Sequence, residues 1–343
     1  MRAVQLMDSF GEDHLQMTTS APLRDDGSDD DTLGAHDVRV RLRASCLNYR
    51  DLLMVRGQYN PRQPLPLVPC SDGAGEVVAV GSGVQQVQVG DRVCPTFVSG
   101  FAEGVPDAGA TKRSRGGPLP GMLREEAIFD ADDLVKIPSH LSFREAATLP
   151  CAALTAWTAL VEEAGIRAGQ TVLVLGTGGV SLFALQIAKM HGCRVVATTS
   201  SDEKAERLRS LGADAVLNYK RDESWGKTVA KTYGGADVVV EVGGAGTLQQ
   251  SLAAVNTGGH VSLIGVLGGG ASKVNLLPVL MRHIRVQGVF VGNKASFVRM
   301  NAALDQQQIR PVLDDDFAME QAKDAFVHLA SAQHFGKITL HVD

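Results

Sequence analysis

Two hydrophobic patterns divide the chain. Before residue 130, short segments alternate between apolar and polar residues, as VRVRLRA does at 38–44 and VQVGDRV at 87–93. A period of two is typical of strands with one buried face, and many short strands of this kind predict a small β-barrel. The segments 24–37 and 98–121, which are rich in turn-forming residues, are predicted to be loops.

The pattern changes at residue 143. A helical segment at 143–164, interrupted at Pro150, leads into apolar runs that alternate with helical segments, from TVLVLG at 171–176 to RVQGVFVG at 285–292. Nearly all-apolar strands separated by helices predict a parallel sheet covered on both faces. After a predicted helix at 317–332, the alternating segment GKITLHV at 336–342 is a last strand that could rejoin the first domain.

Composition narrows the class of protein. At 343 residues the chain exceeds what one hydrophobic core usually supports, so two domains are expected. Its net charge of −5, without a basic cluster, argues against nucleic acid as a partner. No apolar run approaches the roughly 20 residues that a membrane-spanning helix needs. Five widely spaced cysteines without a CxxC motif suit reduced thiols, so we expect a cytoplasmic protein.

The first predicted strand of the parallel sheet ends in a glycine-rich turn. Gly176, Gly178 and Ser181 occupy the small-residue positions of the G-x-G-x-x-G/A motif, between a strand and a helix. Free N–H groups at such a helix start bind a dinucleotide pyrophosphate. A glycine turn without a ligand is the simpler alternative. The predicted binding residues of the turn are Gly176, Thr177, Gly178, Gly179 and Val180.

The end of the next strand predicts which dinucleotide binds. An NAD site places an acidic residue there to bind the ribose 2′-OH, but this chain has only hydroxyl side chains at 198–201. Asp202 and Glu203 come later, where they suit a helix N-terminus. Ser200 and Lys204 could instead bind a 2′-phosphate, which favours NADPH over NADH. Alternatively, Lys204 is a solvated helix lysine.

These features, in this order, resemble the medium-chain dehydrogenase/reductase superfamily. Within it, the chain is most similar to the zinc-independent NADPH:quinone oxidoreductase branch. The resemblance spans the whole chain, and its landmarks are LNYRDLLMVRGQY, PLVPCSDGAGEVVAVGSGV, GDRV, REAATLPCAALTAWTAL, LGTGGVSLFALQIAK and GKITL. It implies an α/β protein with a GroES-like β-barrel catalytic domain and a doubly wound Rossmann NADP-binding domain. The expected divisions are 1–128 for the first, 129–294 for the second, and 295–343 for a C-terminal segment returning to the catalytic domain.

The resemblance also bears on metal binding. Zinc-dependent members have a cysteine where Asn48 stands, a His-Glu pair where Ser71 and Asp72 stand, and a cysteine at Cys151. Catalytic zinc needs three nitrogen, sulfur or carboxylate ligands, and neither Asn48 nor Ser71 is a good one. The cysteine-rich structural zinc lobe has no counterpart at 98–121. We therefore expect no metal.

Without a metal, hydride transfer requires an acceptor that is already electron-poor, such as a quinone or an α,β-unsaturated carbonyl. The resemblance implies that Asn48 and Tyr59 are the catalytic residues, with Tyr59 donating a proton or a hydrogen bond to the forming oxyanion. Tyr59 could equally be a packed loop tyrosine, and Asn48 could bond the backbone of its own turn. Asp51 is expected to hold Arg50 or a backbone amide.

Further cofactor contacts are implied by position in the family motifs. They are Thr155 beside the nicotinamide, Tyr219 near the adenosine phosphate, Val242, Gly243, Gly265 and Val266 at strand ends, Phe290 and Val291 on the edge strand, and Lys337 as a second 2′-phosphate candidate.

The leading hypothesis is a zinc-free, NADPH-dependent reductase of quinones or enones. Two alternatives stay open: an alcohol dehydrogenase of the same superfamily, and a protein that binds NADPH without turnover. By analogy with relatives, a homodimer is expected to form through the edge strand at 285–291.

Overall fold

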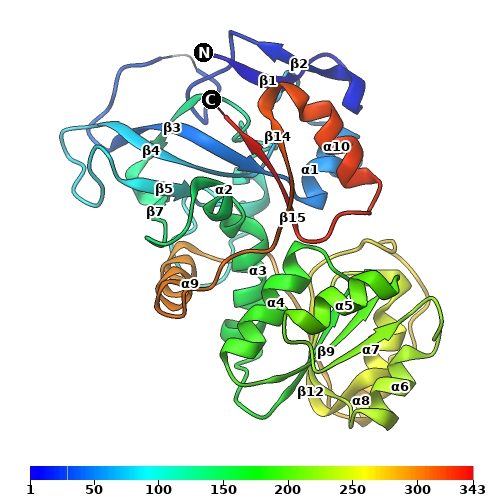
Figure 1. Cartoon of the computed structure of the whole chain (residues 1–343). Coiled ribbons are helices and arrows are strands. Elements are labelled where there is room, and N and C mark those ends of the chain that lie inside the picture. Colours follow the sequence, from blue (N-terminus) through cyan, green and yellow to red (C-terminus); the bar gives the residue numbers. More distant parts are fainter. Residues whose placement is uncertain (29, 343) are drawn as a thin grey trace. The chain divides into compact units, whose positions relative to one another are not determined.

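The computed structural model describes residues 1–28 and 30–342, and these divide into two compact units (Figure 1). The first unit comprises Met1–Ala152 and Asn293–Asp343, and the second comprises Ala153–Gly292. The segment 129–152, which sequence assigned to the nucleotide domain, packs with the first unit. It does so because its strand Leu134–Lys136 pairs with Arg92–Pro95.

A mixed sheet forms the first unit. Its strand order is β14 (Leu313–Ala318), β15 (Lys337–His341), β3 (Asp37–Cys46), β4 (Asp72–Val80), β5 (Arg92–Pro95) and β7 (Leu134–Lys136), with β6 (Glu126–Asp130) also paired to β3 and a separate pair β1 (Ala3–Leu6) and β2 (Leu15–Thr18). The alternation of apolar and polar residues in β3 gives one buried face, as predicted, since Val38, Val40 and Leu42 are fully or almost fully buried. The predicted strand at 87–93 is shorter, because a turn precedes Arg92.

The chain returns to this sheet at its C-terminal end. β15 runs antiparallel to β3, with Thr339 opposite Cys46. The segment 317–332, predicted as a helix, starts inside strand β14 and becomes helical only at Met319. Helices of the unit are α1 (Tyr49–Val55), α2 (Phe143–Ala146), α9 (Lys294–Gln306) and α10 (Ala322–Ala330), with shorter turns at η1 (Glu12–His14), η2 (Ala110–Arg113), η3 (Ala131–Asp133) and η7 (Met319–Gln321) and a wide π turn at Leu149–Ala153.

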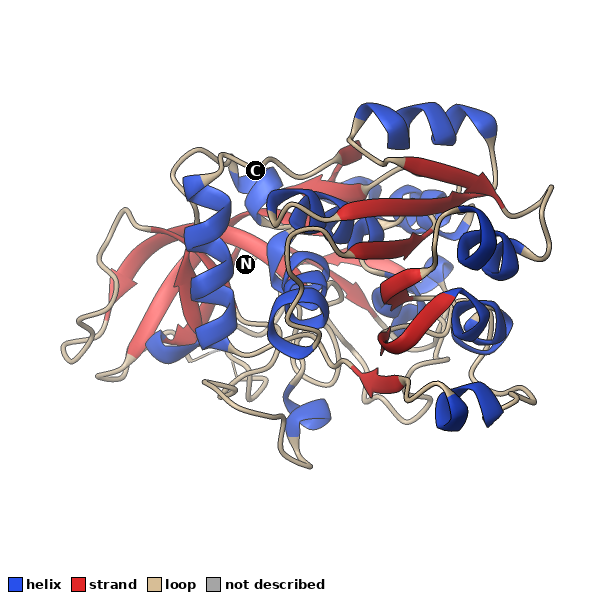
Figure 2. Ribbon diagram, turned by 90° about the horizontal axis from the view of Figure 1, so that it is seen from below, coloured by secondary structure: helices blue, strands red, loops and turns tan. Residues whose placement is uncertain are grey.

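A parallel six-stranded sheet forms the second unit, with helices on both sides (Figure 2). Its strand order is β10 (Ala215–Asn218), β9 (Arg194–Thr199), β8 (Thr171–Leu175), β11 (Ala236–Glu241), β12 (Val255–Leu263) and β13 (Arg285–Gly288). The helices are α3 (Leu154–Trp157), α4 (Gly179–Met190), α5 (Asp202–Ser210), α6 (Trp225–Thr232), α7 (Leu248–Ala254) and α8 (Leu277–Met281), with a π turn at Thr158–Glu163 and a short turn η6 (Gly244–Gly246). The predicted doubly wound fold is confirmed.

Strand order places the functional edge of this sheet. The chain moves outward from β8 through β9 to β10, then resumes on the other side of β8 at β11. Ligands of doubly wound sheets bind at this switch point, outside the carboxyl ends of the strands. The predicted strand at 285–292 ends early at Gly288, and Val291 has a φ of 50° that a strand cannot continue. Among the described residues, none of the helices has the length and apolar character needed to cross a membrane.

Candidate active site

The glycine turn lies at the switch point and has the geometry of a phosphate cradle. Gly176 follows β8 with a φ of 76°, and its N–H donates to Thr198 O at 2.9 Å. Gly178 is the N-cap of α4 and supplies no side chain to bond the first helical N–H groups. Ser181 is buried, and its hydroxyl donates to Leu175 O at 2.6 Å. This bond fastens the helix to the end of the strand, as the third small position of the motif requires.

Space at the turn supports a ligand role for the glycines. A Cβ built on Gly176 or on Gly178 would meet no other atom within 4 Å. Gly176 is still required by the backbone, because its positive φ strains other residues. Gly178 has a φ of −77°, which any residue can adopt. Since neither packing nor backbone demands glycine at 178, the open space fits a phosphate that approaches the backbone.

The end of β9 carries hydroxyl groups and no free acid. Ser201 caps α5, and its hydroxyl accepts from Lys204 N at 3.2 Å. Asp202 accepts from Asn218 Nδ2 at 3.1 Å and from Arg221 Nη2 at 2.5 Å. Its carboxylate is therefore engaged with neighbours and with a helix N-terminus, as predicted. Arg221, which sequence reasoning missed, follows β10 and brings its guanidinium to Asp202 in the first turn of α5.

A buried glutamate organises the next strand end and was also missed. Glu241, at the end of β11, is fully buried and accepts from Gly243 N at 2.7 Å and Gly244 N at 3.0 Å. It also accepts from the hydroxyls of Thr247 and Ser251. One carboxylate thus holds the loop 242–247 in place. An acid inside an apolar strand just before two glycines was the available signal.

Most predicted cofactor residues of the second unit gather at this one edge. Because all six strands are parallel, their carboxyl ends share an edge. The turn residues Gly176–Val180 follow β8, Ser200 and Lys204 follow β9, Tyr219 follows β10, Val242 and Gly243 follow β11, Gly265 and Val266 follow β12, and Phe290 and Val291 follow β13. Tyr219 N donates to Thr199 O at 3.0 Å, which ties this 40% exposed tyrosine to the end of β9. Thr155 lies in α3 and is buried.

In the first unit, a buried polar network joins residues far apart in sequence. Asn48 precedes α1, and its N–H donates to Asp51 Oδ2 at 2.8 Å. Ser71 donates to Asp51 Oδ1 through its N–H at 3.0 Å and its hydroxyl at 2.9 Å. Asn48 Nδ2 donates to Asp72 Oδ2 at 2.9 Å, and Cys151 N donates to the same oxygen at 3.3 Å. Asp51 therefore holds backbone amides, as expected.

Lys337 lies in this network. Its ammonium is buried and donates to Leu47 O at 2.6 Å and to Asn48 Oδ1 at 2.5 Å. An ammonium held in this way is not presented to a 2′-phosphate. The position therefore does not fit the phosphate role that sequence resemblance implied, because β15 aims the side chain toward the start of α1.

Burial shifts the acid–base properties of the network. Desolvation raises the pKa of Asp72 to about 7, although the Lys337 ammonium acts in the opposite direction. Desolvation likewise raises the pKa of Asp51 and that of the Cys151 thiol. Asp72 Oδ1 has no hydrogen-bond partner among the described residues. A buried oxygen without a hydrogen bond adds to the cost of the ionised carboxyl group, and the Lys337 ammonium and the Asn48 amide offset part of that cost.

The same contacts test whether zinc fits. Asn48 Oδ1 faces an ammonium, and Asp72 Oδ2 already accepts two N–H groups. Cys151 is the one residue type at these positions that is typical of a zinc site. The Ser71 hydroxyl donates a hydrogen bond to Asp51 Oδ1. The polar atoms of Asn48, Ser71 and Asp72 are thus used in hydrogen bonds inside the network that contains the Lys337 ammonium. They do not fit a zinc ion.

Tyr59 stands beyond the other end of α1 and is 44% exposed. The Arg50 guanidinium lies 4.9 Å from the centre of its ring and equally far from that of Phe97. Arg50 also donates to Arg115 O and Gly117 O, each at 2.7 Å, so it ties α1 to the loop 98–121. The tyrosine ring therefore packs against the Arg50 guanidinium, and the residue is partly accessible to solvent.

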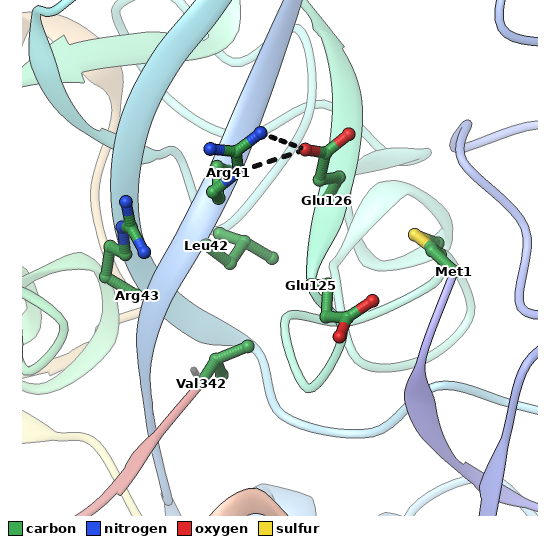
Figure 3. Close-up of a pocket in the computed structure, with 7 residues that line it drawn as sticks. All are labelled: Met1, Arg41, Leu42, Arg43, Glu125, Glu126 and Val342. Atoms are coloured by element: carbon green, nitrogen blue, oxygen red, sulfur yellow. Dashed lines mark hydrogen bonds and ion pairs between the residues drawn. The ribbon is translucent and has the colours of Figure 1, made fainter.

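A separate depression in the first unit does not contribute to this site. It has a volume of about 340 Å³ and is lined by Met1, Arg41, Leu42, Arg43, Glu125, Glu126 and Val342 (Figure 3). Arg41 and Glu126 close one side through an ion pair at 3.0 Å. None of the predicted site residues lines it, so it carries no argument about catalysis.

Comparison with known proteins identifies the family. Residues 34–139 match the alcohol dehydrogenase GroES-like domain, and residues 179–306 match the zinc-binding dehydrogenase domain. A zinc-type alcohol dehydrogenase-like protein of Schizosaccharomyces pombe is 41% identical, over 91% of this chain and 92% of its own. Quinone oxidoreductase-like protein 2 of Bos taurus is 31% identical, over 89% of this chain and 85% of its own.

A solved structure, that of an NAD-dependent alcohol dehydrogenase, superposes with a TM-score of 0.89 at 31% identity, covering 100% of both chains. Fold and site thus define an oxidoreductase with a GroES-like domain and a Rossmann-like domain that binds a nicotinamide cofactor. The chain belongs to the medium-chain dehydrogenase/reductase superfamily.

Proposed function

We propose that this oxidoreductase transfers hydride from NADPH to a quinone or an α,β-unsaturated carbonyl, without zinc. The observation that carries the proposal is the closed network of Asn48, Ser71 and Asp72 around Lys337, at the positions where zinc-dependent relatives have ligands. An alcohol or simple ketone needs a strongly polarising group such as a Lewis acid, whereas a quinone or enone is already electron-poor.

The cofactor supplies hydride when it is bound, and the protein residues bind, orient and protonate. The turn Gly176–Val180 would bind the pyrophosphate, and Ser200 and Lys204 would bind the 2′-phosphate. The preference for NADPH rests on the hydroxyls at the end of β9 and on Lys204 and Arg221. One structural relative is named NAD-dependent, so the cofactor choice needs direct measurement.

Tyr59 and Asn48 are the proposed catalytic residues. Hydride addition to an enone or quinone leaves an oxyanion that must be stabilised and protonated. The hydroxyl of Tyr59, a residue that is 44% exposed, can donate to this oxygen. Asn48 Nδ2 donates to Asp72 Oδ2 at 2.9 Å and makes a longer hydrogen bond of 3.4 Å to Ser71 Oγ. In the proposed reaction the substrate oxygen accepts the hydrogen of this longer bond in place of Ser71 Oγ.

The test is turnover with two classes of substrate. Purified protein should oxidise NADPH with 9,10-phenanthrenequinone, more efficiently than NADH, and treatment with a chelator should leave the rate unchanged. Reduction of NADP⁺ by alcohols, lost on chelation and restored by zinc, would instead identify an alcohol dehydrogenase. Tight NADPH binding without turnover of any quinone or enone would indicate a binding protein.

A homodimer is proposed on the apolar surface of the second unit. α8 has no buried residue, and Leu276, Leu277, Leu280 and Met281 are between 59% and 77% exposed beside the edge strand β13. Apolar surface gathered in this way on a globular protein typically marks a protein interface. Light scattering should give the mass of a dimer, and Leu280→Glu should give a monomer; a monomeric wild-type protein would refute this proposal.

A further inference from the structure

The last strand brings a positive charge into the place where zinc-dependent relatives hold their metal. Lys337 is the first residue of β15, and the pairing of this strand with β3 brings it beside the start of α1. Its neighbour Ile338 accepts from Leu47 N at 3.0 Å, which sets the register. The side chain is 4% exposed, and both of its described acceptors, Leu47 O and Asn48 Oδ1, belong to that segment.

This charge fixes which way the Asn48 carboxamide faces. The amide has an oxygen end and a nitrogen end, and the two ends meet groups of opposite charge. The ammonium of Lys337 can only donate, so it selects the oxygen. Asp72 Oδ2 can accept an amide hydrogen, so it selects the nitrogen, at 2.9 Å. Reversing the amide would place donor against donor, so one orientation is imposed.

The charges of the network form two pairs. Arg50 Nη1 lies 3.6 Å from Asp51 Oδ1, and Lys337 and Asp72 face each other across Asn48. Asp51 and Asp72 are fully buried, and buried carboxylates are costly unless compensated. The buried Lys337 ammonium therefore compensates Asp72, and for this reason it is unsuited to binding the phosphate of a cofactor.

We propose that Lys337 is a positioning residue that replaces the metal charge, by orienting and polarising Asn48 so that its amide hydrogen on the side of Ser71 is offered to the substrate oxygen. This inference rests on the proposed function for its catalytic part. A cation on the oxygen of an amide strengthens its N–H groups as donors, and a preoriented donor stabilises an oxyanion without reorganisation. Lys337 itself does not touch the substrate in this scheme.

The test separates positioning from phosphate binding. Lys337→Met removes the charge at similar length and should lower kcat with 9,10-phenanthrenequinone about 30-fold, while the Kd for NADPH stays within about two-fold. Lys337→Arg should recover part of the kcat. The exposed Lys323, paired with Asp13, gives the control Lys323→Met, which should change neither quantity. If Lys337→Met weakens NADPH more than NADH and spares kcat, Lys337 binds the phosphate and the proposal is wrong.

A stability measurement tests the pairing without any substrate. Lys337→Met should lower the thermal midpoint, because it leaves Asp72 uncompensated. Adding Asp72→Asn should restore part of it, since the double variant removes both charges. A double variant no more stable than Lys337→Met overturns the proposal. If the wild-type protein reduces no quinone or enone but this recovery is seen, the proposed function fails while the orientation of Asn48 by Lys337 stands.

Discussion

The glycine turn of the second unit and the polar network of the first are built in different ways. The turn is contiguous: Gly176–Ser181 lead from one strand into one helix, and their backbone N–H groups are the proposed ligand contacts. The network is assembled from separate segments, with Asn48 capping α1, Asp51 in α1, Asp72 on β4, Cys151 in a π turn and Lys337 on β15. In the turn, glycines leave backbone N–H groups uncovered for a ligand, whereas in the network charged side chains compensate one another.

This difference predicts how the glycine turn and the polar network respond to mutation. In the turn, a side chain can be added without disturbing the fold, so binding and stability should separate. In the network, each group compensates the burial of another, so stability, ionisation and orientation should change together.

The largest expected effect is on the turn. Gly178→Ala places a methyl group in the space proposed for the pyrophosphate, so the Kd for NADPH should rise about 100-fold, as judged from lost phosphate contacts. The stability of the cofactor-free protein should change by no more than about 0.5 kcal/mol, because the added Cβ meets nothing and φ is ordinary. Fluorescence titration and chemical denaturation measure the two quantities.

Gly176→Ala is the matched control for that separation. Its φ of 76° should cost about 1 kcal/mol of stability even without cofactor. If Gly178→Ala instead destabilises the free protein as much as Gly176→Ala and leaves NADPH binding intact, the turn has only a structural role.

A smaller effect is expected at the cofactor phosphate. Lys204→Ala should weaken NADPH by about 30-fold, the range of one hydrogen bond to a charged group, and NADH by less than about two-fold. Ser201 holds the backbone of Lys204 through its hydroxyl, so this start of α5 should persist in the variant. Isothermal titration calorimetry measures the Kd of the variant for NADPH and for NADH. Equal losses of affinity would show that Lys204 does not select the 2′-phosphate.

Sequence predicted the strand, turn and helix around Gly176 well, and the polar network of the first unit only in part. The strand–turn–helix context of Gly176 specifies its own neighbours, since the motif needs only residues within a few positions. The alternation of GKITLHV correctly predicted a last strand. It could not predict that Lys337 points at Asn48, because this depends on the register between β15 and β3, residues about 290 positions apart in sequence.

Glu241 shows a second limit. An acid within an apolar strand looks unfavourable in sequence, and only the folded loop supplies four donors to its carboxylate. The same holds for Asp72, whose neighbours Asn48 and Cys151 arrive from other segments. Buried polar residues are thus the part of a site that local patterns miss, since the groups that satisfy them are set by tertiary contacts.

The smallest expected effect is on the pH dependence of the free energy of unfolding. Burial raises the pKa of Asp72 to about 7 from its ordinary value of 3.8, so the folded state binds this proton more tightly than the unfolded chain does. The stability it contributes is complete below the unfolded pKa and is lost as pH rises through 7. Between pH 6 and 8 the folded protein should lose about 1.4 kcal/mol from this group, the equivalent of one pKa unit.

Asp72→Asn removes the titrating group while keeping an acceptor for Asn48 Nδ2. Urea denaturation at pH 6 and pH 8 should therefore show a smaller loss of stability in the variant than in the wild-type protein. Asp324→Asn, an exposed change on α10, is the control and should leave the loss unchanged. A wild-type protein with the same pH dependence as Asp72→Asn would mean that Asp72 is ionised across this range. In that case Lys337 would compensate it completely, and the network would resemble an ordinary buried ion pair bridged by an amide.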